Sequence, residues 1–408
     1  MSEWKKVKLG EICGRLTSGG TPKANVSSYY NPPTIPWLKT KEVNYCRITE
    51  TENYISEEGL KNSSAKLISP NSVIIAMYGQ GDTAGRVAIN KIPLATNQAC
   101  CNLTIDKSKA DYEFIYYQLC TLYDKLVSLK AGAAQPNLNA RIIKNLEIIM
   151  PSLPIQHRIA TILSRYDSLI ENYQKQIKLL EEAAQRLYKE WFVDLRFPGY
   201  ENTNIVDGVP EGWAKKKLCE LFSFVRGKSY TSKELSDEGT IMVNLKNIQS
   251  FGGYKSDVEK HFIGTFKEEQ TLMKGDLIMG VTDMTQERRL VGSVALIPDF
   301  KETATFSMDL IKLISFKLPN IYLYCAMRYG DVSRQIAPLA NGVNVLHLKP
   351  EAISNIEMVV ASDSIIEKFV SYTSKTIESI LSLQSQLRLL TEARDRLLPK
   401  LMSGEIEI

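Results

Sequence analysis

The sequence predicts an α/β (α+β) fold in which two mixed α/β domains are separated by two long antiparallel helices forming a coiled coil, with a pseudo-two-fold internal repeat. The first observation is a run from Ile155 to Trp191 whose apolar residues recur at steps of three and four, the spacing of one helical face. The second is a sequence repeat that includes this run and the residues just before it. Asn145-Leu-Glu-Ile matches Asn355-Ile-Glu-Met, and Arg186-Leu187 matches Arg396-Leu397, each pair 210 positions apart. The third is that a segment of domain length precedes each helix.

An apolar stripe on each long helix needs a partner, and the copy of the helix is the nearest candidate. At about 1.5 Å per residue each helix spans roughly 55 Å, and an antiparallel pair related by a two-fold axis would carry one domain at each end. The stripe drifts in the second helix, because Ile377 and Ile380 lie one residue away from the expected positions. The residues predicted for the coiled coil and for subunit contacts are Ile159, Ile162, Tyr166, Leu169, Tyr173, Ile177, Leu180, Leu187, Leu383, Leu387, Leu390 and Leu397.

Length and composition indicate an ordinary globular chain. Its 408 residues are 44% hydrophobic and 24% charged, and the formal net charge of +4 permits a nucleic-acid partner without requiring one. The seven cysteines show no metal-binding or redox spacing, so we expect buried free thiols in a reducing cytosol. No apolar signal core or membrane span is evident, so we expect a cytoplasmic protein with no membrane partner.

Turn signals divide each domain into short strands. Strand-like runs at Val73–Tyr78 and Arg86–Asn90 flank the glycine-rich segment 79–85, which predicts a hairpin with Gln80, Asp82, Thr83 and Arg86 near its tip. The second domain repeats the plan with a longer and more basic loop at 282–289. We also expect a helix from Asp111 to Leu129, a break at Gly132–Asn137 and a strand at Leu146–Met150.

The repeat and the breakers place the domain boundaries. Both domains open in the same way, with Trp4-Lys-Lys-Val-Lys-Leu and Trp213-Ala-Lys-Lys-Lys-Leu. Glycine and proline at Phe197-Pro-Gly and Gly208-Val-Pro-Glu-Gly mark a linker. The predicted organisation is a first domain at 1–153, a central helix at 154–196, a linker at 197–212, a second domain at 213–361 and a C-terminal helix at 362–402.

Catalytic constellations are mostly missing from the sequence. Asn31-Pro-Pro-Thr34 is similar to the Asn/Asp-Pro-Pro-aromatic motif of amino-methyltransferases, but the aromatic residue is absent and no glycine-rich turn for S-adenosylmethionine follows a strand. His157, His261 and His347 show no ligand spacing, so no metal site is expected. A binding and assembly protein is the main hypothesis, and a self-sufficient DNA adenine methyltransferase using Asn31 to Thr34 is the alternative.

Several stretches share the pattern of one family. They are Leu153-Pro-Ile-Gln-His-Arg-Ile-Ala, Leu187-Tyr-Lys-Glu-Trp-Phe, Val209-Pro-Glu-Gly-Trp213, Gly19-Gly-Thr-Pro22 with Ile35-Pro-Trp-Leu-Lys39, and Lys274-Gly-Asp-Leu-Ile with Val281-Thr-Asp. With Arg396-Leu-Leu-Pro-Lys-Leu-Met-Ser-Gly-Glu405, they make nearly the whole chain resemble the specificity subunit of type I restriction-modification enzymes. The chain departs from the family pattern at Ile155, where an acidic residue is usual, and at Ser362-Asp-Ser-Ile, which lacks the proline-glutamine signature.

The resemblance implies a non-catalytic subunit. It would have two target-recognition domains that each read one half of a split, asymmetric DNA target, and two helices that set an unread gap. The implied partners are double-stranded DNA, two modification (methyltransferase) subunits and ATP-dependent restriction subunits. This chain would bind no cofactor, and S-adenosylmethionine, ATP and Mg would belong to the partners.

Basic, amide and aromatic side chains near the predicted tips are the candidates for reading bases or holding phosphates. In the first domain they are Lys23, Tyr29, Lys39, Lys41, Gln80, Thr83 and Arg86. In the second domain they are Lys228, Tyr230, Lys246, Asn247, Thr285, Gln286, Arg288 and Arg289.

Overall fold

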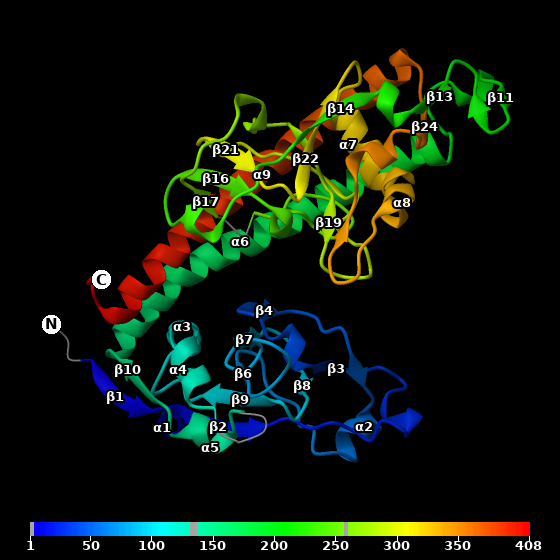
Figure 1. The fold of residues 1–408 in the computed structure, drawn as a ribbon. Coiled ribbons are helices and arrows are strands. Elements are labelled where there is room, and N and C mark those ends of the chain that lie inside the picture. Colours follow the sequence, from blue (N-terminus) through cyan, green and yellow to red (C-terminus); the bar gives the residue numbers. More distant parts are fainter. Residues whose placement is uncertain (1–3, 131–136, 257–259) are drawn as a thin grey trace. The chain divides into compact units, whose positions relative to one another are not determined.

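The computed structural model describes residues 4–130, 137–256 and 260–408, and the chain divides into two compact units (Figure 1). Unit 1 comprises the chain up to Ser168 together with Ala393–Ile408, and unit 2 comprises Leu169–Glu392. Each unit contains a mixed α/β domain and a stretch of both long helices, α6 (Leu153–Tyr188) and α9 (Asp363–Ser403). The predicted mixed α/β fold with two long helices is confirmed.

Unit 1 is built on a five-stranded sheet of order β2-β9-β6-β7-β4, beside a three-stranded sheet of order β5-β3-β8. In β6 (Val73–Ala76), Val73 and Ile75 join one core and Ile74 and Ala76 join another, because successive side chains of a strand point to opposite faces. The elements are β1 (Lys5–Lys8), α1 (Leu9–Ile12), β2 (Cys13–Ser18), η1 (Ser27–Tyr29), β3 (Ile35–Leu38), η2 (Thr40–Glu42), β4 (Cys46–Ile48), β5 (Tyr54–Ile55), α2 (Glu57–Lys61), β7 (Val87–Asn90), β8 (Ala95–Thr96), β9 (Cys100–Ile105), α3 (Tyr112–Thr121), α4 (Tyr123–Ser128), α5 (Ala140–Lys144) and β10 (Glu147–Met150).

Unit 2 repeats this topology. Its sheet β14-β22-β18-β20 has the order and antiparallel pairing of β2-β9-β6-β7, and β17-β16-β21 matches β5-β3-β8, including the parallel pair. The elements are η3 (Lys189–Val193), η4 (Tyr200–Asn202), β11 (Ile205–Val206), β12 (Val209–Pro210), β13 (Ala214–Lys217), η5 (Leu218–Glu220), β14 (Phe222–Arg226), η6 (Ser232–Glu234), β15 (Leu235–Ser236), β16 (Thr240–Val243), η7 (Leu245–Asn247), β17 (His261–Phe262), η8 (Glu268–Gln270), β18 (Leu277–Gly280), β19 (Thr282–Asp283), β20 (Val294–Leu296), β21 (Ala304–Phe306), β22 (Leu310–Ser315), α7 (Asn320–Tyr329), α8 (Val332–Ile336), η9 (Ala337–Leu339), β23 (Leu346–His347), η10 (Pro350–Ile353) and β24 (Glu357–Val360).

The entrance of each domain pairs with the strand that leads into the long helix. Lys5–Lys8 lies antiparallel to Glu147–Met150, and Ala214–Lys217 lies antiparallel to Glu357–Val360. The repeated entrance sequences therefore close each domain at the base of its helix, and the duplication is confirmed in three dimensions.

The two long helices run antiparallel. Inside unit 1, Ile159 and Leu163 near the start of α6 share a core with Leu401 near the end of α9. Inside unit 2, Trp191, just after α6 ends, packs on Phe369 near the start of α9 with ring centroids 5.9 Å apart. The predicted antiparallel pair is confirmed.

The predicted seam was wrong in its middle. Leu169 is 42% exposed, and Ile170 is buried in its place, because the stripe shifts by one residue around Asp167. The predicted drift in the second helix is confirmed, since Ile377 and Ile380 are both buried. Of the other predicted seam residues, Ile159 and Ile177 are buried, and Ile162, Tyr166, Tyr173, Leu180, Leu187, Leu383, Leu387, Leu390 and Leu397 are partly buried along the edges of the seam.

Local boundaries differ from the prediction in three places. The helix expected from Asp111 to Leu129 is two helices, α3 and α4, which are separated at Leu122. The break predicted at Gly132–Asn137 lies outside the described residues except for Asn137, and the unpredicted α5 precedes the predicted strand. The predicted linker contains a small hairpin, β11 with β12, whose Asp207-Gly208 turn has positive φ at both residues.

Among the described helices, none combines the length and the apolar character needed to cross a bilayer. All seven cysteines lie in the described ranges, and none forms a disulfide. Cys100, Cys101 and Cys325 are buried as predicted, whereas Cys219 is exposed.

Candidate nucleic-acid interface

The hairpin predicted in the first domain is present. β6 and β7 pair antiparallel, with Val73 opposite Ile89 and Ile75 opposite Val87. Gln80 is therefore at the exposed tip, where the hydroxyl of Thr83 donates to its carbonyl at 2.7 Å. Gly81 has φ +61 and open space around it, so the tip presents backbone as well as side chains.

Arg86 lies at the base of this tip and is already engaged. Its guanidinium donates to Asp82 at 2.5 Å and to Asn44 at 3.0 Å. The hydrogen bond from Arg86 lowers the pKa of the Asp82 carboxyl. Tyr45, with φ +53, packs against Tyr123 beside it, and burial raises the pKa of Tyr45 to about 12. The sequence prediction missed these two tyrosines, because only the fold brings them to the hairpin.

The other candidates of the first domain do not gather at the tip. Lys39 donates to Asn53 at 3.0 Å, and Lys41 forms an ion pair with Glu52. Lys39 precedes η2 and Lys41 lies within it, a few residues before Asn44, which accepts a hydrogen bond from Arg86. Lys23 and Tyr29 precede the three-stranded sheet, in the segment around η1.

In the second domain a buried carboxylate shapes the basic loop. Asp283 is buried, and its side chain accepts from the backbone and hydroxyl of Thr285, both at 2.8 Å, and from the Leu290 backbone at 2.7 Å. Gln286 at the exposed turn donates to the Val343 carbonyl at 2.7 Å. Asp283 was not a candidate, although its place at the start of the loop suits an Asx turn.

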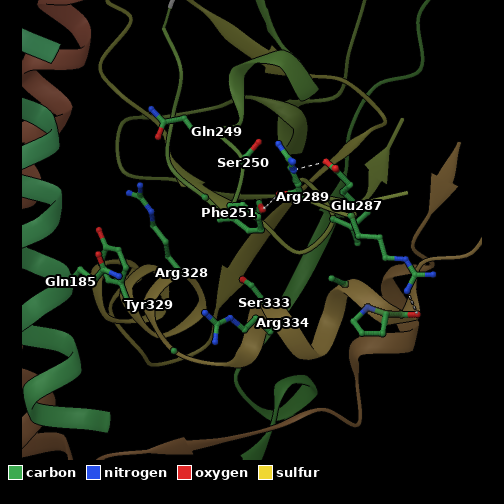
Figure 2. Close-up of a pocket in the computed structure, with 17 residues that line it drawn as sticks. Gln185, Gln249, Ser250, Phe251, Glu287, Arg289, Arg328, Tyr329, Ser333 and Arg334 are labelled. Carbon is green, nitrogen blue, oxygen red and sulfur yellow. Dashed lines mark hydrogen bonds and ion pairs between the residues drawn. The ribbon is translucent and has the colours of Figure 1, made fainter. Parts of the chain in front are cut away.

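A cleft of about 640 Å³ opens beside this loop in unit 2 (Figure 2). Its lining includes the predicted Arg288 and Arg289, together with Arg328 and Arg334, against one acidic residue, Glu287. Arg289 pairs with Glu287 at 2.6 Å, and Arg288 donates to the Pro338 carbonyl at 3.3 Å. Arg328 is paired with Glu181, so Arg288 and Arg334 supply the positive charge that makes the cleft suitable for an anionic partner.

The remaining candidates of the second domain lie elsewhere, and one needs correction. Asn247 is 2% exposed. Its side-chain Oδ1 accepts from the Asn244 backbone N–H at 3.0 Å, and its side-chain Nδ2 donates to the Lys255 backbone carbonyl at 3.1 Å. This side chain holds a turn and is not available to read a base. Lys246 is exposed next to it, Lys228 bonds through its backbone to Phe306, and Tyr230 packs its ring on Phe262.

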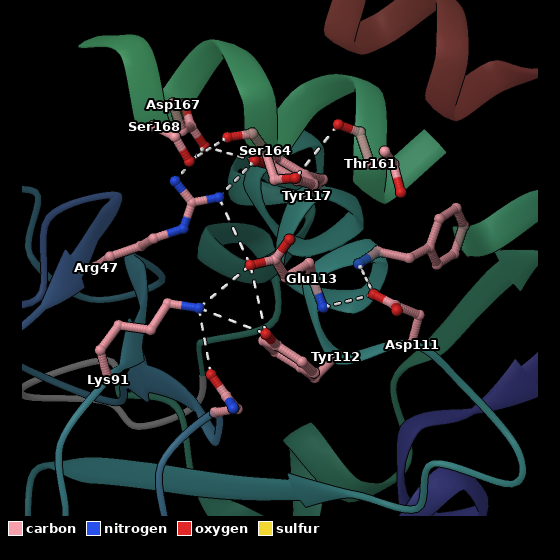
Figure 3. A network of polar contacts seen from close by, with 12 residues as sticks. Arg47, Lys91, Asp111, Tyr112, Glu113, Tyr117, Thr161, Ser164, Asp167 and Ser168 are labelled. Carbon is pink, nitrogen blue, oxygen red and sulfur yellow. Dashed lines mark hydrogen bonds and ion pairs between the residues drawn. The ribbon is translucent and has the colours of Figure 1, made fainter. Parts of the chain in front are cut away.

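A buried polar network joins the first domain to the long helices inside unit 1 (Figure 3). Asp167 on α6 accepts from the Tyr117 hydroxyl at 2.5 Å and from Arg394 on α9 at 2.9 Å, and Arg47 lies 3.6 Å away. Burial raises the pKa of Tyr117, so its hydroxyl stays protonated and donates. In the internal repeat, Asp167 corresponds to buried Ile377. At this position the two halves of the repeat therefore differ, a carboxylate in one and an apolar side chain in the other.

The proline-glutamine stretch at the start of α6 also attaches the first domain. Gln156 is buried; its oxygen accepts from the Asp111 backbone at 3.0 Å and its nitrogen donates to the Pro151 carbonyl at 2.8 Å. His157 pairs with the Asp111 carboxylate at 2.8 Å. The position equivalent to Gln156 is Ile366, which is buried in an apolar core. The departure noted in the sequence thus replaces a polar contact by an apolar one.

The comparisons with known proteins agree with this architecture. A family model described as a type I restriction modification DNA specificity domain matches residues 1–182. The type I restriction enzyme MjaIX specificity subunit of Methanocaldococcus jannaschii is 28% identical over 421 residues, which cover 100% of this chain and 94% of that protein. The HindI specificity subunit of Haemophilus influenzae is 21% identical over 491 residues, with both chains fully covered.

A solved structure shares the fold. The crystal structure of the type I restriction-modification S subunit from M. genitalium superposes with a TM-score of 0.62 at 17% sequence identity, covering 98% of this chain and 96% of that one. The likeness therefore extends over both mixed α/β domains and both long helices.

Proposed function

Because the chain belongs to the specificity subunits of type I restriction-modification systems, we propose that it reads an asymmetric DNA target made of two separated half-sites, one for each mixed α/β domain. The observation that carries this proposal is one topology built twice with different tips. Gln80 and Thr83 lie at the tip in one copy, with Arg86 at its base, whereas the loop of the other copy is longer and carries Gln286, Arg288 and Arg289. Different side chains at equivalent tips favour different bases.

The relatives are named as specificity subunits, so this chain is the non-catalytic component and catalysis belongs to its partners. A type I complex contains modification and restriction subunits besides DNA. We propose that two modification subunits bind, one for each half of the internal repeat, and that S-adenosylmethionine, ATP and Mg are held by the partner subunits in the cytoplasm.

Nothing supports the methyltransferase alternative. Asn31-Pro-Pro-Thr34 is an exposed loop between η1 and β3, and the relatives reported above are named as specificity subunits. The proline turn explains these residues without a methyl-transfer site.

The test uses this chain assembled with its modification subunits. Methylated adenines mapped in the source genome define the target, and the complex is then titrated with the target duplex and with duplexes in which either half is scrambled. We expect each scrambled half to weaken binding, since each mismatched base pair typically costs about 1–3 kcal/mol. Equal binding to all three duplexes would refute the proposal.

A further inference from the structure

Phe251 is an unusual residue on the rim of the arginine-lined cleft in unit 2. Its side chain is 69% exposed, and its backbone adopts φ +67, a conformation that aromatic residues rarely take. Figure 2 shows Phe251 between the loop that carries Arg289 and the helix that carries Arg328. An exposed aromatic ring and a strained backbone at one residue point to a use outside folding.

The loop around Phe251 is firmly held. The Phe251 backbone donates to the Arg289 carbonyl at 3.0 Å, and the Gly253 backbone donates to the Val294 carbonyl at 2.8 Å. Gly252 and Gly253 both have φ +106, and a Cβ on either would lie 2.9 Å from Arg328. The two glycines therefore let the backbone pack closely against the Arg328 side chain. This packing positions the Phe251 ring before any partner binds.

The surroundings of the ring suit a phosphate backbone. Arg334 is exposed on α8 at the same cleft and has no acidic partner among the described residues. Of the four arginines that line the cleft, Arg289 is paired with Glu287 and Arg328 with Glu181, so Arg334 and Arg288 supply its unbalanced positive charge. Positive charge beside an exposed aromatic ring is the combination that proteins use to hold phosphates while a ring stacks on or wedges between bases.

The corresponding place in unit 1 is built differently. There Tyr45, rather than a glycine, donates its backbone N–H to the β7 carbonyl of Val87, as Gly253 does to Val294 of β20. The Tyr45 ring packs on Tyr123 with centroids 6.4 Å apart, so it is turned onto its own domain. The protruding ring is thus a property of the second domain.

We propose that Phe251 is a specificity-determining wedge, which inserts against a base step of the half-site read by the second domain, while Arg334 holds a neighbouring phosphate. This inference rests on the proposed function and adds a local distortion of the DNA to it. The distortion is expected at one half-site, because the ring at the corresponding place of the first domain, Tyr45, packs on Tyr123 and is 39% exposed, against 69% for Phe251.

The test compares F251N with wild type in the complete complex with modification subunits. Asparagine tolerates positive φ, so the loop keeps its conformation while the ring is lost. The matched control is F316A, which removes a phenylalanine that is 56% exposed and directly follows β22. The probes are the mapped target duplex, duplexes with either half scrambled, and target duplexes carrying 2-aminopurine at single positions.

We expect F251N to bind the target about ten-fold more weakly, as for loss of a stacked base, and to lose a 2-aminopurine signal that wild type shows at one base step. The ten-fold difference should vanish on one scrambled duplex only, and F316A should match wild type. R334Q should lower the slope of log K against log salt by about one, and R186Q, on the exposed face of α6, should not.

Wild-type affinity and signal in F251N would overturn the wedge. So would an equal loss on all duplexes, which would indicate a contact that reads no sequence. If wild type itself fails to distinguish target from scrambled DNA, the proposed function fails first, and this outcome is separate from a failure of F251N alone.

Discussion

Arg328 on α7 donates to both carboxylate oxygens of Glu181 on α6, at 2.8 and 2.9 Å, inside unit 2. Both side chains are largely buried, and the guanidinium also lies over the rings of Tyr324 and Tyr329. This pair attaches the second domain to the long helix and supports the loop with Gly252 and Gly253. It is therefore both a structural contact and the base of the Phe251 loop.

Replacing Glu181 with glutamine should destabilise unit 2. A buried guanidinium that loses its carboxylate keeps its desolvation cost, so we expect a loss of about 3 kcal/mol in the free energy of unfolding. Urea denaturation of the purified chain measures it. E182Q removes the neighbouring surface pair with Arg186 and should cost less than about 0.5 kcal/mol. Equal effects of the two variants would show that the Glu181 pair adds nothing.

Replacing Asp167 with asparagine should destabilise unit 1 in the same way. Arg394 and Arg47 would then face each other without the shared carboxylate, and we expect a loss of about 3 kcal/mol. Y117F removes the hydrogen bond that Tyr117 donates to Asp167 and the one that it accepts from Arg47, and should cost about 2 kcal/mol. A D167N variant no less stable than Y117F would contradict this account.

Replacing Gln286, Arg288 and Arg289 together with alanine should alter recognition of one half-site. These side chains surround the tip of the second domain, and each lost bidentate base contact is worth about 1–3 kcal/mol. Binding to the target and to each half-scrambled duplex checks the prediction. The matched triple variant at Gln80, Thr83 and Arg86 should affect the other half. Equal weakening for every duplex would mark these residues as phosphate contacts.

Lengthening both long helices should lengthen the unread gap. Seven residues inserted after Ser168 and seven after Glu392 fall at the boundaries of the two units and leave the contacts within each unit intact. A heptad adds about 10 Å of helix, which corresponds to about three base pairs. Mapping the methylated target of the variant gives the gap directly. An unchanged gap would refute a ruler role for the helices.

The cysteines should differ sharply in reactivity. Burial raises the pKa of Cys101 and Cys325 to about 12, so at pH 8 both remain thiols out of reach of reagent. Cys219 is exposed and should react first with a maleimide, as followed by mass spectrometry. C219S should lose the fast phase, and urea should release the others. Fast labelling of Cys325 in the native chain would contradict the buried core of unit 2.

Local patterns in the sequence were enough for much of the architecture. Helical periodicity over Ile155–Trp191 and the glycines at 79–85 predicted the long helices and the hairpin, because each signal depends on residues close together in the chain. The 210-residue repeat predicted the duplicated domains, because it is visible when one half of the sequence is compared with the other. The family resemblance added the DNA-reading role.

The tertiary structure decided which side chains are free to act. Asn247 is consumed by a turn, and Leu169 gives way to Ile170 in the seam around the Asp167–Arg394 pair. Phe251 reaches the arginine cleft only because Gly252 and Gly253 rest on Arg328, far away in sequence. Such facts depend on the packing of segments remote in the chain, and local periodicity has no information about which remote partner fills a given space.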